Sequence, residues 1–288
     1  MNIKKLRSRS PLRYPGAKTR GLDYLFDRFP DNITDYREPF LGGGSVALEY
    51  SRRNPDQEIW VNDIYYNLYV FWKELQTNSL LMKEWATEIF LDLQDKYPEE
   101  RRDFWDKCCV DLNGDKIDNF KRACFFYFCN RMSYSGMTEK AYSHSGFGIT
   151  FTLGNIKKLP VFASLTKNWR ITNVDYRELY EDTQPDTFLF LDPPYDIDAS
   201  LYGSDEQETH RSFSHREFYE TCEKTRANSL ITYNDGDNLK EWFSEWNQEL
   251  WDLRYSFSHS QDYLEDEHNR KELLIANYDI PQENVLPI

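Results

Sequence analysis

The ten residues FLFLDPPYDI, from Phe188 to Ile197, constrain the fold more than any other stretch of the chain. Their first four residues are apolar without alternation, which predicts a strand covered on both faces, as in the centre of a parallel α/β sheet. Asp192 ends that strand, and the two prolines after it fix φ and lack a backbone N–H, so the ladder cannot continue. Open α/β sheets bind their ligands at this carboxyl edge. A polar residue that merely ends a strand beside an exposed Tyr195 would produce the same local pattern.

Seven strand-like segments recur along the chain, and helical patterns separate several of them. They cover residues 36–40, 58–62, 169–174, 188–191, 229–233, 251–257 and 272–278. Strands that alternate with helical patterns are the signature of βαβ units. We therefore predict an α/β fold with a doubly wound, mostly parallel, seven-stranded sheet.

The stretch between the second and third strand-like segments interrupts this rhythm. Amphipathic patterns at 71–90 and 119–132 predict long helices, and a run rich in glycine, serine and tyrosine follows them. We interpret this stretch as a mainly helical insertion over residues 73–160. Residues 1–72 and 161–288 would then form the domain that contains the sheet.

Composition excludes several classes of protein. The chain has five cysteines, Cys108, Cys109, Cys124, Cys129 and Cys222. They form no C-x-x-C pair and no zinc spacing, so we expect reduced thiols, no disulfide and no metal site. The longest purely apolar run covers residues 123–129, which is far too short to span a membrane, and the basic N-terminus lacks the apolar part of a signal peptide. We expect a cytoplasmic protein that does not enter membranes.

The charge distribution is uneven. The net charge of −14 argues against a polyanionic partner, because the chain as a whole would repel it. Residues 1–20, however, contain seven basic residues and no acidic one. This stretch permits binding to DNA but does not establish it, because a basic tail is often only a solvated arm.

A glycine-rich turn follows the first strand-like segment. Gly42, Gly43 and Gly44 allow a tight turn and the close approach of a ligand, and Ser45 is a natural N-cap for the next helix. Asp63 ends the second strand-like segment, where an acid can accept bonds from ribose hydroxyls. The pyrophosphate pattern G-x-G-x-x-G is absent, so the turn suits a nucleoside ligand without phosphates.

Several ordered motifs together resemble one family. They are RYPGAKTR (13–20), EPFLGGGSVAL (38–48), ND (62–63), NRMSYSGM (130–137), NVDY (173–176), LDPPY (191–195) and NRKELLIANY (269–278). In this order, over nearly the whole chain, they resemble the DNA adenine-N6 methyltransferases of the Dam-like (D12) class. The resemblance implies a Rossmann-like methyltransferase sheet, a helical target-recognition insertion and the cofactor S-adenosyl-L-methionine.

The resemblance also implies a cofactor site. Its residues would be Tyr14, Lys18, Pro39, Phe40, Gly42, Gly44, Asp63, Asp175, Tyr176 and Asp192. The turn at 39–44 would pass the methionine end, Asp63 would bind the ribose, and Asp175 with Tyr176 would bind the adenine. The first motif departs from the family's Trp-Ala-Gly-Gly-Lys but keeps its aromatic residue and its lysine. Asp175 and Tyr176 would equally suit a strand end with a surface aromatic.

The turn after the central strand would carry the chemistry. Asp192 and the carbonyl of Pro193 are acceptors that could each take one hydrogen of an adenine N6 amine, which frees its lone pair for the methyl group. Pro194 stiffens the turn, so the acceptors are preorganised. Tyr195 would stack on the base, which must be flipped out of the duplex before N6 is accessible.

The insertion and the basic arm would bind double-stranded DNA. The expected contact residues are Arg9, Arg13, Asn130, Arg131, Tyr134, Ser135 and Lys140. Arg131 could pair with guanine and Asn130 with adenine in the major groove. Both residues would equally suit the end of a helix, where an amide and an arginine cap the last turn.

Other functions share parts of this pattern. The target could be RNA or a protein glutamine, although an acid at the head of the proline turn favours adenine. A non-catalytic DNA-binding protein on the same scaffold is a further alternative. The sequence leaves the target site open, GATC being the commonest in the class. It also leaves open a cognate restriction nuclease as partner, the choice between a monomer and a weak dimer, and an association with the nucleoid of a bacterial or phage-infected cell.

Overall fold

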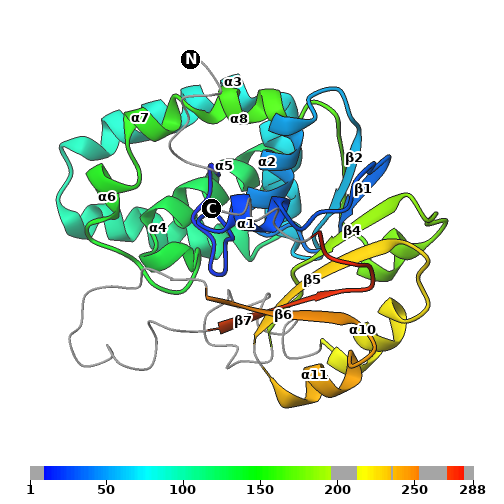
Figure 1. The fold of residues 1–288 in the computed structure, drawn as a ribbon. Coiled ribbons are helices and arrows are strands. Elements are labelled where there is room, and N and C mark those ends of the chain that lie inside the picture. Colours follow the sequence, from blue (N-terminus) through cyan, green and yellow to red (C-terminus); the bar gives the residue numbers. More distant parts are fainter. Residues whose placement is uncertain (1–9, 196–212, 235, 253–270, 282–288) are drawn as a thin grey trace, which may run out of the picture. The chain divides into compact units, whose positions relative to one another are not determined.

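The computed structural model describes residues 10–195, 213–234, 236–252 and 271–281 (Figure 1). The strands are β1 Asp35–Glu38, β2 Ile59–Asn62, β3 Trp169–Thr172, β4 Thr187–Leu191, β5 Asn228–Asn234, β6 Asn247–Asp252 and β7 Lys271–Ala276. The longer helices are α2 Ser45–Arg53, α3 Tyr66–Gln94, α4 Pro98–Leu112, α5 Asn119–Met132, α8 Leu159–Leu165, α10 His215–Cys222 and α11 Asp237–Trp242. The short ones are α1 Leu22–Phe26, α6 Gly146–Ile149, α7 Leu153–Ile156 and the 3-10 turns η2 Tyr134–Gly136 and η3 Tyr176–Tyr180.

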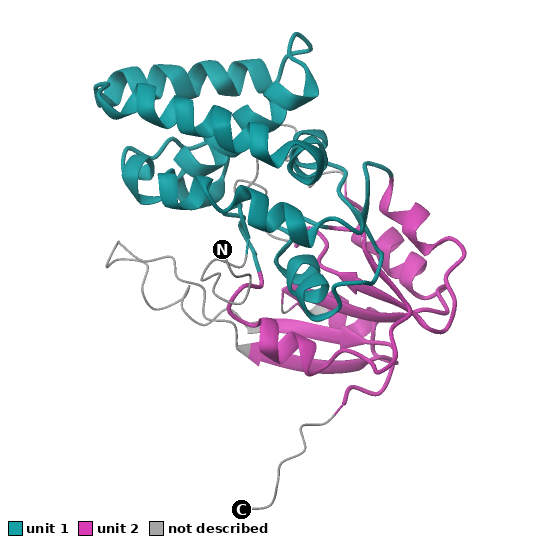
Figure 2. Cartoon of the chain, turned by 90° about the horizontal axis from the view of Figure 1, so that it is seen from above, with its two compact units in different colours: residues 1–17, 41–174, 198–212 teal, residues 18–40, 175–197, 213–288 magenta. Residues whose placement is uncertain are grey.

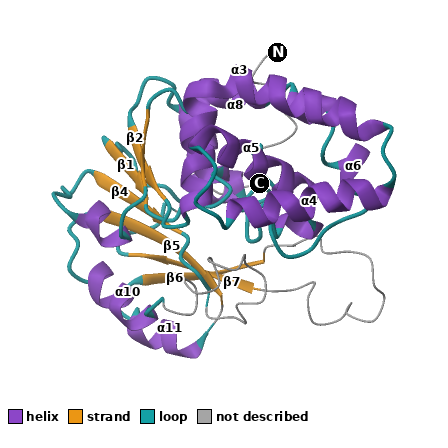
Figure 3. Ribbon diagram, turned by 180° about the vertical axis from the view of Figure 1, so that it is seen from behind, coloured by secondary structure: helices purple, strands orange, loops and turns teal. Residues whose placement is uncertain are grey.

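The strands form a seven-stranded sheet in the order β3-β2-β1-β4-β5-β7-β6 (Figure 3). The pairs β1 with β4, β2 with β3 and β4 with β5 are parallel. Strand β7 runs antiparallel to both β5 and β6. The prediction of an α/β fold with a mostly parallel, seven-stranded sheet is therefore confirmed.

Strand β6 lies earlier in the chain than predicted. The sequence pattern placed a strand at 251–257, whereas β6 covers Asn247–Asp252, and residues 253–270 lie outside the described part of the chain. The sequence NQELWD is polar, but it pairs along its whole length with β7, where Leu250 lies opposite Leu273. Pairing with β7 therefore determines where β6 forms. The strand propensity of its own residues does not indicate this position.

Strand β4 is buried on both faces, as the sequence predicted. On one face Leu189 belongs to a core cluster with Phe218 of α10 and Ile231 of β5. On the other face the ring of Phe188 lies 4.5 Å from that of Phe29. Because successive side chains of a strand point to opposite faces, an unbroken apolar run suits this central position.

The chain divides into two compact units (Figure 2). Unit 1 contains residues 1–17, 41–174 and 198–212, and unit 2 contains residues 18–40, 175–197 and 213–288. Unit 1 thus combines the helices of the insertion with α2, β2 and β3, and unit 2 holds the other five strands. This division does not follow the predicted boundaries, partly because α3 begins before residue 73 and packs on α5 and α8. The predicted domains stay a prediction.

Helix α5 is the centre of the insertion. Its eleven residues from Arg122 to Met132 are all buried, which is typical of a helix with neighbours all round. Helices α3 and α4 both pack on it, and the ring of Phe71 stacks on that of Tyr127 at 6.2 Å. The helices predicted at 71–90 and 119–132 are confirmed as part of α3 and as α5.

Helix α4 was not predicted from the sequence. It begins at Pro98, where a helix needs no N–H, and the Glu100 carboxylate accepts a hydrogen bond from the Tyr97 backbone at 2.9 Å. Its buried residues are Trp105, Cys108 and Leu112. So narrow an apolar stripe in a highly charged sequence gives a weak periodic signal.

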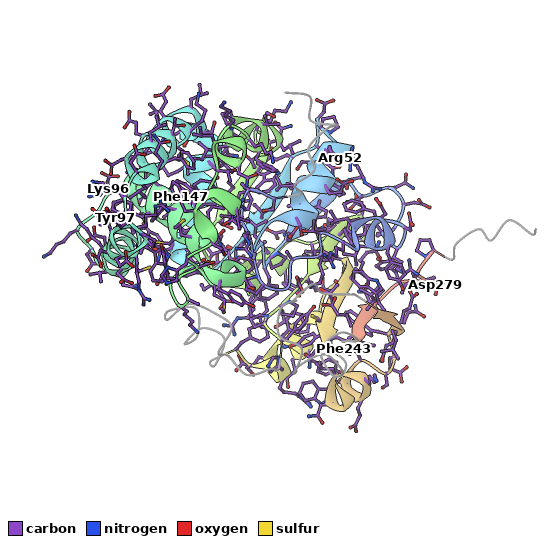
Figure 4. The ribbon with its side chains drawn as sticks, turned by 90° about the vertical axis from the view of Figure 1, so that its left-hand side faces the viewer. Arg52, Lys96, Tyr97, Phe147, Phe243 and Asp279 are labelled. Carbon is purple, nitrogen blue, oxygen red and sulfur yellow. The ribbon has the colours of Figure 1, made fainter. Side chains whose placement is uncertain are left out.

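The short helix α6 packs on the longer helices of the insertion. Phe147, labelled in Figure 4, stacks on Phe90 of α3 with ring centroids 4.8 Å apart. The Arg101 guanidinium lies 4.1 Å from the centroid of the same Phe147 ring. These contacts attach the glycine-rich segment to α3 and α4.

Gly136 supplies a test of this packing. It has a φ of 83°, and a Cβ there would lie 2.1 Å from the Arg13 carbonyl oxygen, a backbone atom that cannot rotate away. Gly148 has nearly the same φ, 80°, with nothing within 4 Å of such a Cβ. We expect Gly136→Ala to lower the free energy of unfolding in urea by about 1–3 kcal/mol more than Gly148→Ala. Equal losses would show that the loop does not pack against Arg13.

Candidate functional site

Asp192 lies at the carboxyl end of β4 and is held by two side chains of unit 2. Its two carboxylate oxygens lie 2.9 and 2.8 Å from the Lys18 ammonium nitrogen. The Thr232 hydroxyl of β5 donates to the same carboxylate at 2.7 Å. The Asp192 side chain is 23% exposed, whereas that of Lys18 is only 2% exposed. The acid therefore has a fixed orientation and an open side.

Glu272, at the start of β7, joins this group. Its Oε1 lies 3.8 Å from the Lys18 ammonium nitrogen and accepts a hydrogen bond from the Tyr195 hydroxyl at 3.0 Å. Burial by itself lowers the pKa of Lys18, but the two neighbouring carboxylates outweigh it, so that this pKa is raised above its usual value. Lys18 is therefore a cation at neutral pH, enclosed by Asp192 and Glu272.

Tyr195 is fixed by its ring as well as by its hydroxyl. The ring stacks on Tyr233 with centroids 5.6 Å apart and planes 18° apart. The Tyr233 hydroxyl shares a hydrogen bond with Nδ1 of His215, the first residue of α10. The Lys18 ammonium nitrogen lies 5.2 Å from the centroid of the Tyr195 ring. Unit 2 thus brings together Lys18, Asp192 and Tyr195 of the predicted site.

Four residues of this group were missed in the sequence analysis: Thr232, Tyr233, Glu272 and His215. For Glu272 a signal existed, because an acid inside the apolar run ELLIA of a closing strand has no structural reason to be there. The other three are ordinary residues of a strand and a helix start. Only the pairing of β5 with β4 and β7 places them beside Asp192.

Phe40 and Tyr176 form an aromatic wall in unit 2. Their ring centroids lie 5.3 Å apart, and the ring of Phe213 lies 5.8 Å from each of them. Pro39, just before Phe40, is buried. A half-buried wall of this kind offers flat surfaces on which a nucleobase can stack.

Asp175 has a structural partner. Its carboxylate accepts from the Arg177 side chain at 2.7 and 2.8 Å and from the Arg177 backbone N–H at 2.9 Å, which caps η3. These hydrogen bonds lower the pKa of Asp175 below its usual value. This arrangement matches the alternative of a capped strand end, and contact with a cofactor stays a prediction.

The glycine-rich turn of unit 1 is held by Asp63. The Asp63 carboxylate accepts from the Gly42 N–H at 2.8 Å and from the Tyr65 N–H at 2.9 Å. Gly42 and Gly44 have φ values of 49° and 63°, which residues other than glycine rarely adopt. Tyr14 lies directly against the turn, since a Cβ on Gly43 would be 2.7 Å from the Cβ of Tyr14. Unit 1 therefore brings Tyr14, the turn and Asp63 together.

Asn130 and Arg131 at the end of α5 are buried rather than exposed. The Asn130 amide oxygen accepts from the Arg13 N–H at 2.9 Å, and its nitrogen donates to the Arg13 carbonyl at 2.7 Å. The Arg131 guanidinium donates to the Thr150 carbonyl at 2.8 and 2.6 Å, and burial lowers its pKa. These contacts favour the structural alternative for both residues, and their contact with bases stays a prediction.

The remaining DNA-contact candidates differ in accessibility. Tyr134 is 55% exposed, and Ser135 next to it is half-buried with a φ of 51°. Lys140 is half-buried, and the Arg13 guanidinium donates to the Ser133 carbonyl at 3.1 Å. Arg9 lies outside the described residues. Lys18, which the sequence placed in a basic arm, is buried and does not belong to such a surface.

Neither a membrane-spanning helix nor a metal-binding cluster occurs among the described residues. No helix among them is long and apolar enough to cross a membrane. Within the same ranges, no group of three or more histidine, cysteine or acidic side chains has the arrangement of a metal site. All five cysteines are free thiols.

Comparisons with known proteins point to one family. Residues 14–257 match the family described as D12 class N6 adenine-specific DNA methyltransferase. The type II methyltransferase M.MjaIII of Methanocaldococcus jannaschii is 27% identical over 64% of this chain and 68% of its own length. The modification methylase StsI of Streptococcus sanguinis is 25% identical over 96% of this chain. The match spans only 44% of the length of StsI. The type II methyltransferase M.CviBI of Paramecium bursaria Chlorella virus NC1A is 22% identical over 93% of this chain and 98% of its own length.

The buried amide of Asn130 can be tested directly. In Asn130→Ala the Arg13 backbone N–H and carbonyl lose their partner in the interior, which costs about 1–3 kcal/mol of unfolding free energy. We expect urea denaturation to show this loss, and DNA binding to weaken equally on cognate and scrambled duplexes. A loss confined to the cognate duplex, with unchanged stability, would instead assign Asn130 to base recognition.

Proposed function

The chain belongs to the D12 class N6 adenine-specific DNA methyltransferase family, and we propose that it transfers a methyl group from S-adenosyl-L-methionine to the N6 amine of an adenine flipped out of duplex DNA. One observation carries the proposal for the reaction: Lys18 and Thr232 fix the carboxylate of Asp192 at the end of a buried strand. The same side chain keeps an exposed side toward which a substrate amine can donate.

Asp192 would act on the amine by orientation rather than by removing a proton first. The N6 lone pair is conjugated into the adenine ring, so the amine is a poor nucleophile. Each carboxylate oxygen has two acceptor sites, so the bonds to Lys18 and Thr232 leave Asp192 able to accept an N6 hydrogen. Together with the Pro193 carbonyl, this acceptor would favour a pyramidal nitrogen whose lone pair is available. Pro194 and the surrounding bonds hold the acceptors in place before the reaction.

Tyr195 would hold the flipped base. Its ring is half-buried and stacks on Tyr233, and a flat ring held in this way is a surface on which a base would stack. Stacking of a base on an aromatic ring contributes about 1–3 kcal/mol, which offsets part of the cost of leaving the duplex. The hydrogen bond from its hydroxyl to Glu272 would limit rotation of the ring.

The cofactor would be held by residues whose chemistry suits a nucleoside with a charged amino-acid end. The turn from Pro39 to Gly44, with Tyr14 against it, would bind the methionine end, and Asp63 the ribose. Tyr176 and Phe40 supply aromatic surface for the adenine, with Asp175 beside them. Lys18 would contribute to the cofactor site by fixing the carboxylate of Asp192. S-adenosyl-L-methionine would supply the electrophilic methyl group.

Duplex DNA would be bound by the insertion and the basic arm. Tyr134, which is exposed, is the best placed of the described candidates. Ser135 and Lys140 are near it in sequence, and the Arg13 guanidinium donates to the carbonyl of the neighbouring Ser133. Two of the relatives are named type II methyltransferases, which supports a role beside a cognate restriction nuclease. Sequencing of methylated adenines in DNA from cells that express the protein tests this role and identifies the target, GATC or another.

Asp192→Asn tests the proposed chemistry. Its amide has nearly the shape of the acid but turns an NH₂ group or a neutral oxygen toward the N6 hydrogens. We expect the single-turnover rate of methyl transfer to duplex DNA to fall by about 100-fold or more, as when a preorganised polar group is removed from other active sites. Mass spectrometry of N6-methyladenine measures this rate. The same assay on an RNA of the same sequence tests whether RNA is the substrate instead.

Asp186→Asn is the matched control for this substitution. Asp186 stands just before the other end of β4, where its carboxylate accepts from the Thr34 hydroxyl. The same chemical change there should leave the rate unaltered. The proposed role of Asp192 is wrong if Asp192→Asn transfers methyl groups at the rate of the Asp186→Asn control.

Asp63→Ala tests the cofactor site. It removes the carboxylate proposed to bind the ribose, so the dissociation constant of S-adenosyl-L-methionine should rise by the equivalent of about 1.5–3 kcal/mol. Turnover at saturating cofactor should fall less. Because Asp63 also holds the Gly42 N–H, Asp63→Asn, which keeps an acceptor oxygen, separates loss of the turn from loss of the charge. Calorimetric titration measures both variants, and an unchanged dissociation constant in both removes Asp63 from the site.

A further inference from the structure

We propose that Glu272 is a positioning residue of the methyl transfer, which orients Tyr195 and Lys18 around Asp192. The inference rests on the proposed function, because it concerns the same site. Neither the sequence motifs nor the comparisons assign a role to this glutamate.

Burying the side chain of Glu272 is energetically unfavourable unless other groups compensate for its lost hydration. Its side chain is 2% exposed, on a strand whose next four residues, Leu273 to Ala276, are all buried and apolar. A carboxylate loses its hydration there, and a buried acid is retained only with partners. Lys18 does not require it, because Asp192 already lies at 2.8 Å from the ammonium and neutralises it. An apolar residue in its place would give β7 an ordinary core position.

The first effect of Glu272 concerns Tyr195. Its Oε1 accepts the Tyr195 hydroxyl bond at 3.0 Å, while Tyr233 covers one face of the ring. Stacking alone leaves a ring free to slide and tilt over its neighbour. A hydrogen bond at the far end of the ring removes that freedom, so the ring keeps one orientation toward the base.

The second effect concerns charge. Two carboxyl groups lie near the Lys18 ammonium, that of Asp192 at 2.8 Å and that of Glu272 at 3.8 Å. Without Glu272 the ammonium would interact more strongly with Asp192, which weakens Asp192 as an acceptor. With Glu272 3.8 Å away, the ammonium is shared between two carboxylates. Asp192 then keeps the electron density that attracts the N6 hydrogens as positive charge grows on that nitrogen.

A purely structural role makes a different prediction. If Glu272 served only the stability of unit 2, its loss would reduce the amount of folded enzyme but not the rate of each folded molecule. A positioning role predicts the opposite: Glu272→Leu folds well in its apolar strand but reacts slowly. The two roles are therefore separated by the rate constant at saturation.

The experiment compares Glu272→Gln, Glu272→Leu and Tyr195→Phe in the full-length chain. Single-turnover methyl transfer is measured with saturating S-adenosyl-L-methionine and duplex DNA, together with both dissociation constants and thermal unfolding. We expect both Glu272 variants to lose about 10- to 100-fold in rate, the range for a misplaced reactive group, with dissociation constants within about twofold of wild type. Removing the Tyr195 hydroxyl in the Glu272→Leu background should change the rate by less than about twofold, because the hydrogen bond between the two residues is already absent.

Glu249→Gln is the matched control. Glu249 on the neighbouring strand β6 also accepts a tyrosine hydroxyl, that of Tyr24, and pairs with a cation, Arg28, but none of these three contacts Asp192 in the described structure. It should alter stability and leave the rate unchanged. Comparing Glu249→Gln with Glu272→Gln therefore separates the effect of the position of Glu272 beside Asp192 from the general effect of replacing a paired glutamate.

The outcomes separate this inference from the proposed function. If the wild-type chain transfers no methyl group to adenine in any duplex, the proposed function fails. If the wild type is active and the Glu272 variants react at its rate, the positioning role alone is wrong. It is equally wrong if the Tyr195→Phe and Glu272→Leu losses multiply, or if Glu249→Gln lowers the rate as much as Glu272→Gln.

Discussion

The buried ammonium of Lys18 is the constraint around which the site of unit 2 is organised. A cation that is 2% exposed must be matched by anions within a few ångströms, and the chain supplies them from two strands, β4 and β7. Asp192 and Glu272 therefore cannot move independently, and Tyr195 and Thr232 are attached to them by hydrogen bonds. The turn from Asp192 to Tyr195 is therefore held at its first residue by Lys18 and at its last by Glu272, which Lys18 also faces.

The topology of the sheet explains how these residues meet. Strands β4 and β5 are parallel with Leu191 opposite Ile231, so Asp192, which follows β4, lies beside Thr232 of β5 and accepts its hydroxyl bond. Strand β7 runs in the opposite direction, so its beginning, rather than its end, lies at the carboxyl edge of β4 and β5, and Glu272 pairs with Asn234 of β5. One reversed strand thus adds an acid to the edge where parallel strands end.

The insertion shows how similar sequence patterns can serve structure or recognition. Polar residues at the end of the apolar helix α5 suggested side chains that reach toward DNA. In the structure Asn130 and Arg131 instead form hydrogen bonds with the backbone of Arg13 and Thr150. The polarity of a residue shows that it needs hydrogen-bond partners, but not whether a loop or a ligand supplies them. Tyr134, a few residues later, is the one of these candidates that is widely exposed.

The sequence by itself determined the central buried strand, the acid and prolines that end it, the mostly parallel sheet and the family. These features are local, because an unbroken apolar run, a proline pair and ordered motifs can be read within a few residues. Only the tertiary structure decided the partners of Lys18, the place of β6, and the roles of Glu272, Tyr233 and His215. Those depend on strand order and register, which join residues as distant as Lys18 and Glu272, and no local pattern encodes such pairings.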